Sequence, residues 1–176
     1  SELGDFAGRA YHHSIRKENN GLRLTMRRRA PLIRKGLFPV EIVKDIRMMY
    51  NSPSLEIDYS LVNSSGEQLE FSLGVEFNFS LLAGASPEVT FSFPGEKESL
   101  MMASSGEKTG VSGITVRNNL ENFSLSLQVG QKASFWWFPV ETISQSEKGF
   151  DLTYQSTVIM PKWDVVLPAE REWTAQ

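Results

Sequence analysis

The sequence contains no cysteine among its 176 residues, so neither a disulfide framework nor a thiolate metal site can form. It also has no apolar run near the ~20 residues needed to span a bilayer. Its first residues, SELGDF, lack the basic and apolar regions of a signal peptide. These absences predict a protein that does not enter the membrane and that works in the reducing cytoplasm.

An excess of basic charge is absent as well. The formal net charge is -3 and the pI is about 5.5, so the chain has no field that would hold a polyphosphate backbone. Arg27, Arg28 and Arg29 are adjacent, but alternation along a strand would divide them between two faces and favours a solvated surface. Nucleic acid is therefore not an expected partner.

Residues in a pattern typical of catalysis are scarce. The chain has only 2 histidines, His12 and His13, and because they are adjacent an extended backbone points them apart rather than onto one metal. No pair of carboxylates spaced for glycoside chemistry, and no nucleophile with its base, can be identified from the pattern. We therefore expect no catalytic residue, no metal and no cofactor in this chain.

Strict alternation of apolar and polar residues is the clearest positive signal. It runs through residues 69–79 and recurs at 55–61 and 89–93, with Gly, Pro, Asn and Ser between the segments. A helix would scatter these apolar residues around its circumference, whereas a strand places them all on one face. With no convincing amphipathic helix elsewhere, the pattern predicts an all-β, antiparallel β-sandwich.

Residues 133–140 differ because both faces of the expected strand are apolar. Phe135 and Trp137 point to one face, while Trp136, Phe138 and Val140 point to the other. Such a strand either lies in the core, covered on both sides, or presents one face to a ligand or partner. Both interpretations stay open at this point.

Two groups of polar residues are candidates for ligand contact. Glu76 and Asn78 share the polar face of the best strand, where either Glu76 forms a structural ion pair with a basic residue or the two residues form a site for sugar hydroxyls. Residues 141–147, with Glu141 and Glu147 at the ends, follow the aromatic run and are either a plain loop or part of a carbohydrate site. The predicted substrate-binding residues are Trp136, Trp137, Glu141, Glu147, Glu76 and Asn78.

Two segments carry a resemblance to a known family. GVEFNFSLLAG at 74–84 and FPVETISQSEKGFDLTYQSTVIMPKW at 138–163 resemble the C-terminal β-sandwich of glycoside hydrolase family 57, the 4-α-glucanotransferases and related α-amylases. LGDF at 3–6 resembles the linker that leaves the catalytic barrel of that family. The resemblance implies a galactose mutarotase-like supersandwich. It also implies that the catalytic glutamate and aspartate belong to a barrel outside this chain.

The resemblance leads to a domain assignment and a function. We expect residues 1–20 to be a linker from an N-terminal catalytic barrel, 21–168 to be the sandwich, and 169–176 to be a tail. The expected function is that of a non-catalytic accessory domain of a retaining α-glucan enzyme, which supports the barrel and contacts maltooligosaccharide. The alternatives are a freestanding mutarotase-like sugar epimerase and a protein-interaction module.

Overall fold

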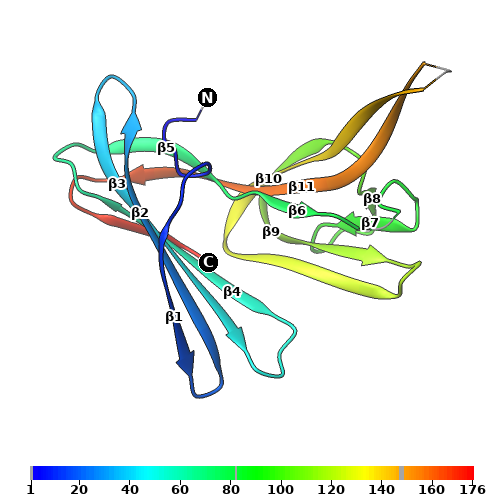
Figure 1. Ribbon diagram of the computed structural model, residues 1–176, viewed down its shortest axis with the longest axis horizontal. Helices are drawn as coiled ribbons and strands as arrows, with labels where there is room; N and C mark the ends of the chain where they lie inside the picture. Colours follow the sequence, from blue (N-terminus) through cyan, green and yellow to red (C-terminus); the bar gives the residue numbers. More distant parts are fainter. Residues whose placement is uncertain (1, 82, 147–148) are drawn as a thin grey trace. The chain divides into compact units, whose positions relative to one another are not determined.

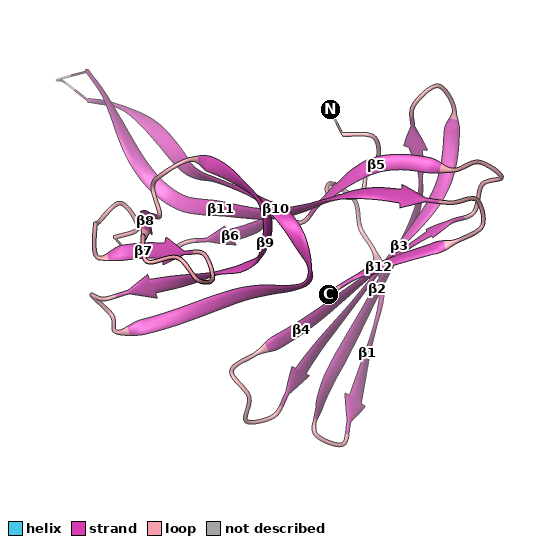
Figure 2. Cartoon of the chain, turned by 180° about the vertical axis from the view of Figure 1, so that it is seen from behind, coloured by secondary structure: helices cyan, strands magenta, loops and turns pink. Residues whose placement is uncertain are grey.

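The regular secondary structure of the described part of the chain consists of β-strands. The computed structural model covers residues 2–81, 83–146 and 149–176, and these ranges contain strands and loops without a helix (Figure 2). The all-β prediction is confirmed, and no described segment forms a helix long and apolar enough to cross a membrane. In chain order the strands are β1 His12–Glu18, β2 Gly21–Ile33, β3 Leu37–Met49, β4 Leu55–Asn63, β5 Leu69–Gly74, β6 Phe77–Phe79, β7 Val89–Ser92, β8 Leu100–Met101, β9 Gly106–Asn118, β10 Phe123–Ser146, β11 Gly149–Leu167 and β12 Glu172–Ala175.

The strands form two antiparallel sheets, which can be traced by colour in Figure 1. One is five-stranded in the order β1-β2-β3-β4-β12, and the other is seven-stranded in the order β5-β11-β10-β9-β7-β8, with β6 pairing with β11. The chain divides into two compact units, one made of the residues up to Phe71 with Asp164–Gln176, the other of Ser72–Trp163.

The five-stranded sheet of the first unit has one apolar and one charged face. β2 and β3 pair in continuous register, from Gly21 opposite Met49 to Ile33 opposite Leu37. Because side chains alternate along each strand, the apolar ones gather on one face, which includes the core residues Val40, Ile42, Tyr59 and Leu61.

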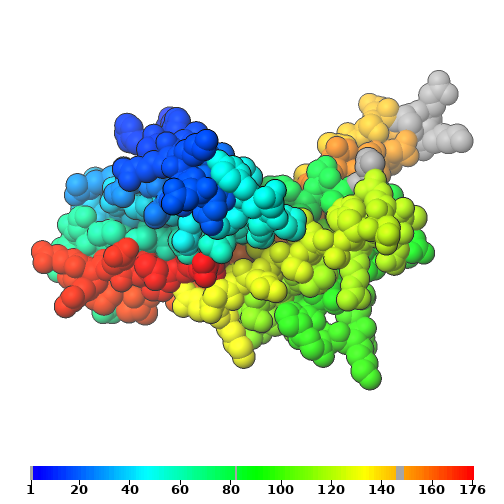
Figure 3. All heavy atoms as spheres, turned by 90° about the horizontal axis from the view of Figure 1, so that it is seen from below, coloured from blue at the N-terminus to red at the C-terminus, as the bar shows by residue number. Residues whose placement is uncertain are grey.

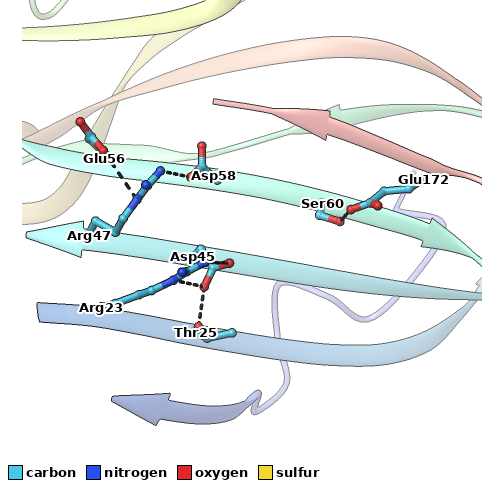
Figure 4. Close-up of polar contacts among 8 residues, drawn as sticks. All are labelled: Arg23, Thr25, Asp45, Arg47, Glu56, Asp58, Ser60 and Glu172. Carbon is cyan, nitrogen blue, oxygen red and sulfur yellow. Dashed lines mark hydrogen bonds and ion pairs between the residues drawn. The ribbon is translucent and has the colours of Figure 1, made fainter. Parts of the chain in front are cut away.

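Carboxylates on the charged face are engaged in cross-strand contacts (Figure 4). Arg23 donates to Asp45 through Nε at 3.2 Å and Nη2 at 2.9 Å, and Thr25 donates to the same carboxylate. Hydrogen bonding to Arg23 holds the pKa of Asp45 below its usual value. Arg47 donates to Asp58 on the next strand through Nη2 alone, and its Nε lies 3.6 Å from Glu56 Oε2. These acids therefore link neighbouring strands of the sheet.

The ends of the chain also enter this sheet. β1, within residues 1–20, pairs with β2, and β12, within residues 169–176, pairs with β4. Arg28 binds Asp5 through Nη2 at 2.6 Å, while Arg27 and Arg29 are exposed, so the adjacent arginines are indeed divided between two faces. That residues 1–20 lead out of a catalytic barrel stays a prediction.

The segment 69–79 was expected as one strand and forms two, which corrects the sequence prediction. β5 ends at Gly74 and β6 begins at Phe77, and both lie beside β11. Val75 N–H donates to Pro161 O at 3.0 Å, but Pro161 has no N–H to donate in return, so the ladder is interrupted there. Burial still alternates through the break, with the apolar side chains less exposed than their polar neighbours.

The second unit has a dense core on one face of β10 and β11. Phe135 and Ile159 are almost completely buried, as is Phe91 from β7. The core also encloses a chain of hydrogen bonds. Thr157 Oγ1 donates to Met102 O at 2.6 Å and lies 2.6 Å from the Tyr154 hydroxyl, which must be the donor because Thr157 has only one hydroxyl proton.

Candidate functional site

The adjacent residues Trp136 and Trp137 lie on opposite faces of β10. Trp137 is 8% exposed, and its ring packs against Phe91 with centroids 5.5 Å apart. Its Nε1 donates to Ser104 Oγ at 3.2 Å. Trp137 is therefore a core residue, which corrects its placement among the ligand contacts, whereas Trp136, at 36% exposed, can meet a ligand.

Trp136 belongs to an exposed apolar stripe on β10. Phe138 and Val140 follow at every second position and are also exposed, so the three side chains share one side of the sheet. We call this stripe, Trp136 with Phe138 and Val140, the aromatic face. Lys162 Nζ lies over the Trp136 ring, 5.1 Å from its centroid, within the range of a cation–π contact. Of the two interpretations that the sequence left open, the exposures match the second, with core on one side of the strand and a partly exposed apolar stripe on the other.

Glu76 and Asn78 lie on the same side of the sheet as the aromatic face, one strand further across. Asn78 on β6 pairs with Val158 on β11, which in turn pairs with Phe138, so the side chains of this row point to one side. Asn78 Nδ2 donates to Glu76 Oε1 at 2.8 Å, and both residues are exposed. Among the described residues Glu76 makes no ion pair, so its local partner is an amide rather than a cation. The structure therefore places three of the predicted site residues, Trp136, Asn78 and Glu76, on one side of the sheet, with β11 between Trp136 and the other two.

The other predicted acids are not part of this group. A register shift between Val140 and Glu141 places Glu141 opposite Tyr154, on the side of the strand pair away from the aromatic face. Glu147 lies outside the described residues. The group assembled by the structure is therefore smaller than the predicted set.

Two charged residues at the aromatic face were missed by sequence reasoning. Glu107 on β9 pairs directly with Trp136, and Lys162 on β11 reaches the same ring. No local pattern marks either residue, because each comes from another strand and is brought to Trp136 only by the sheet register. The side of the sheet that bears the aromatic face thus combines flat rings with an amide, carboxylates and an ammonium group, a combination suited to binding a polyhydroxylated ligand.

No metal site accompanies this surface. Within the described ranges, no group of three or more His, Asp or Glu side chains is placed to hold a metal ion. His12 and His13 are both exposed on β1, opposite Arg27 and Met26.

Comparison with known protein families decides which group the chain belongs to. The family model described as "Alpha-amylase/4-alpha-glucanotransferase, C-terminal" matches residues 1–176, the whole chain. The chain belongs to this family. The resemblance carried by residues 74–84 and 138–163 is therefore confirmed at the level of the family.

Relatives place this family domain in much longer proteins. The chain is 26% identical over 169 residues to Alpha-amylase 1 of Dictyoglomus thermophilum, covering 93% of this chain but 22% of the relative. The structure of 4-alpha-glucanotransferase from Thermococcus litoralis matches 99% of this chain and 23% of that chain, with a TM-score of 0.69 and 19% identity. The chain thus spans about a fifth of the length of these family members.

The fold also occurs outside the α-amylase/4-α-glucanotransferase family. A galactose mutarotase related enzyme from Lactobacillus acidophilus has a TM-score of 0.60 and 16% identity, covering 93% of this chain and 68% of that chain. At this identity the likeness shows the fold alone. The predicted antiparallel sandwich of galactose mutarotase-like type is confirmed.

Proposed function

We propose that this chain is the non-catalytic accessory domain of an α-glucan-processing enzyme, an α-amylase or a 4-α-glucanotransferase, in which it supports an N-terminal catalytic barrel. This proposal rests on the share of a longer relative that the chain covers. The C-terminal family model matches the entire chain, yet the chain spans only 22% of Alpha-amylase 1. We place the reaction in the remaining length of such a protein. We place the enzyme in the cytoplasm.

Contact with α-glucan is the second part of the proposal, and the aromatic face supports it. Apolar C–H faces of glucose residues can lie on the rings of Trp136 and Phe138. The Asn78 amide, Glu76 and Glu107 offer donors and acceptors for the hydroxyl groups at the edges of the sugar. Because the rings are only partly exposed and lie on a sheet surface, we expect weak binding, with a Kd in the millimolar range, about −4 kcal/mol.

The glucan contact is tested by titrating the 176-residue chain with maltoheptaose. Calorimetry and tryptophan fluorescence monitor the binding. We expect Trp136→Ala to remove binding. Phe123→Ala serves as the matched control, because Phe123 is an aromatic residue of the same strand with similar exposure. Binding that survives Trp136→Ala unchanged would show that the aromatic face is not the site.

An activity assay tests the accessory role separately. The purified chain should neither transfer nor hydrolyse α-glucan, and the full-length polypeptide that carries it should do one of the two. Turnover by the chain alone, in proportion to its concentration after repeated purification, would contradict the proposal.

A further inference from the structure

Strands β10 and β11 extend as a two-stranded ribbon beyond the other strands of the second unit. The pairing of β9 with β10 ends at Trp137, and the pairing of β6 with β11 starts at Thr157. Beyond these points, residues 141–145 and 150–154, here called the arm, pair only with each other in the described part of the sheet. The arm, golden and orange, stands clear of the green and yellow strands of its unit (Figures 1 and 3).

One side of the arm carries three large apolar residues together with Glu141 and Gln145, and the other side is polar. Ile143 lies opposite Leu152, and Phe150 lies two positions further on, so the three side chains share a face. They are 69%, 65% and 77% exposed, respectively. The other face carries only short polar side chains, namely Thr142, Ser144, Asp151 and Thr153.

The apolar side of the arm continues the side of the ribbon that faces the core. Tyr154, at the base of the arm, hydrogen-bonds to the buried Thr157. A loop covers its ring so closely that a Cβ on Gly84 would lie 2.3 Å from Tyr154 Cε1, so only glycine fits there. Among the described residues this cover ends at Tyr154, and Ile143, Phe150 and Leu152 beyond it are exposed.

A partner that covers the arm would take its exposed apolar surface out of water. An isolated two-stranded ribbon is only marginally stable in water. The three large apolar side chains of the arm expose on the order of 400 Å². A contiguous patch of this kind marks an interaction surface. We propose that Ile143, Phe150 and Leu152 dock the arm onto the catalytic domain of the same polypeptide, an inference that rests on the proposed function.

The size of the patch favours a tethered domain over a second copy of the chain. Two arms facing each other would bury about half of the roughly 800 Å² per partner that a stable complex between separate proteins uses. A domain on the same polypeptide acts at an effective concentration near millimolar, so a small apolar contact suffices. The Dictyoglomus relative, of which this chain covers 22%, shows that the family domain occurs with a long additional region.

Hydrogen exchange compares the arm in the 176-residue chain with the arm in the full-length polypeptide. We expect the amides of residues 141–145 and 150–154 to exchange roughly tenfold more slowly in the full-length polypeptide. Combining Ile143→Thr, Phe150→Thr and Leu152→Thr should abolish this difference, because threonine preserves strand propensity while removing the apolar surface. Ile15→Thr, Leu37→Thr and Leu55→Thr form the matched control, since these apolar residues are similarly exposed in the five-stranded sheet.

The outcomes distinguish between the molecules that could cover the arm, namely the catalytic domain, a second copy of the chain and a sugar. Equal exchange in both proteins overturns the proposal, as does slowing in the 176-residue chain that grows with its concentration, which would indicate a second copy. Slowing that requires added maltoheptaose overturns it in favour of a sugar. A full-length polypeptide that protects the arm but lacks α-glucan activity would remove the proposed function and leave the docking intact, while activity without protection would do the reverse.

Discussion

The β10–β11 pair has two halves that share one strand geometry and differ in what covers them. In the core half, Phe135 and Ile159 are buried on one side and Trp136 and Phe138 form a partly exposed stripe on the other. In the arm, the side continuous with the core bears Ile143 and the other exposed apolar residues. The difference teaches that alternation fixes which side chains share a face, while burial depends on whether another layer reaches that face.

The largest expected difference between the halves concerns Phe135. Phe135→Ala removes a fully buried ring and should lower the free energy of unfolding by about 3–5 kcal/mol. Urea denaturation followed by tryptophan fluorescence measures this loss. Phe138→Ala, on the exposed side of the same strand, is the control and should cost less than half as much. Equal losses would mean that the two faces of the core half are equally covered.

The buried hydrogen bonds where the core half meets the arm should give the next largest effect. Thr157→Val keeps the shape of the side chain but leaves Met102 O and the Tyr154 hydroxyl without their partner. We expect a loss of about 1–3 kcal/mol in the free energy of unfolding. Thr153→Val, on the polar face of the arm, is the matched control and should have little effect. A neutral Thr157→Val would show that these hydrogen bonds do not stabilise the junction.

Alkaline pH should lower the free energy of unfolding through Tyr154, the covered residue at the base of the arm. Burial raises the pKa of Tyr154, although its bond to Thr157 acts in the opposite direction. Below the unfolded pKa of about 10 the hydroxyl is neutral in both states. As the pH rises further, the unfolded state ionises first, so stability falls until the pH passes the folded pKa.

Tyr154→Phe tests this pH dependence. The variant should lose about 1 kcal/mol at neutral pH with the hydrogen bond, and it should lose less additional stability than the unaltered chain between pH 9 and 11. Denaturation at a series of pH values measures both. Identical alkaline slopes would mean that Tyr154 is as solvated as an ordinary surface tyrosine.

The smallest effect is expected in the arm itself. Phe150→Thr in the 176-residue chain should change the free energy of unfolding by less than about 0.5 kcal/mol, because the ring is already in water. Denaturation under the conditions used for Phe135→Ala gives the direct comparison. A loss of several kcal/mol would contradict an uncovered arm.

Local patterns predicted much of the fold. The alternation in residues 69–79 correctly predicted which side chains are less exposed, but it did not predict the break at Val75, which depends on Pro161, a residue far away in the sequence. The tryptophan pair gives the same lesson at the site. Alternation separated Trp136 from Trp137, yet which one is covered depends on Phe91, on another strand.

Local residue patterns are enough to specify the strand periodicity, the division of side chains between faces and the family to which the chain belongs. Tertiary structure decided which strands became neighbours, and so placed Glu107, Lys162 and Asn78 around the exposed stripe of β10. It also decided that, among the described residues, the cover ends at Tyr154 and Ile143, Phe150 and Leu152 are exposed. The reason is physical: the side-chain period of a strand is a property of its own backbone, whereas register and burial arise from hydrogen bonds and packing between segments distant in the chain.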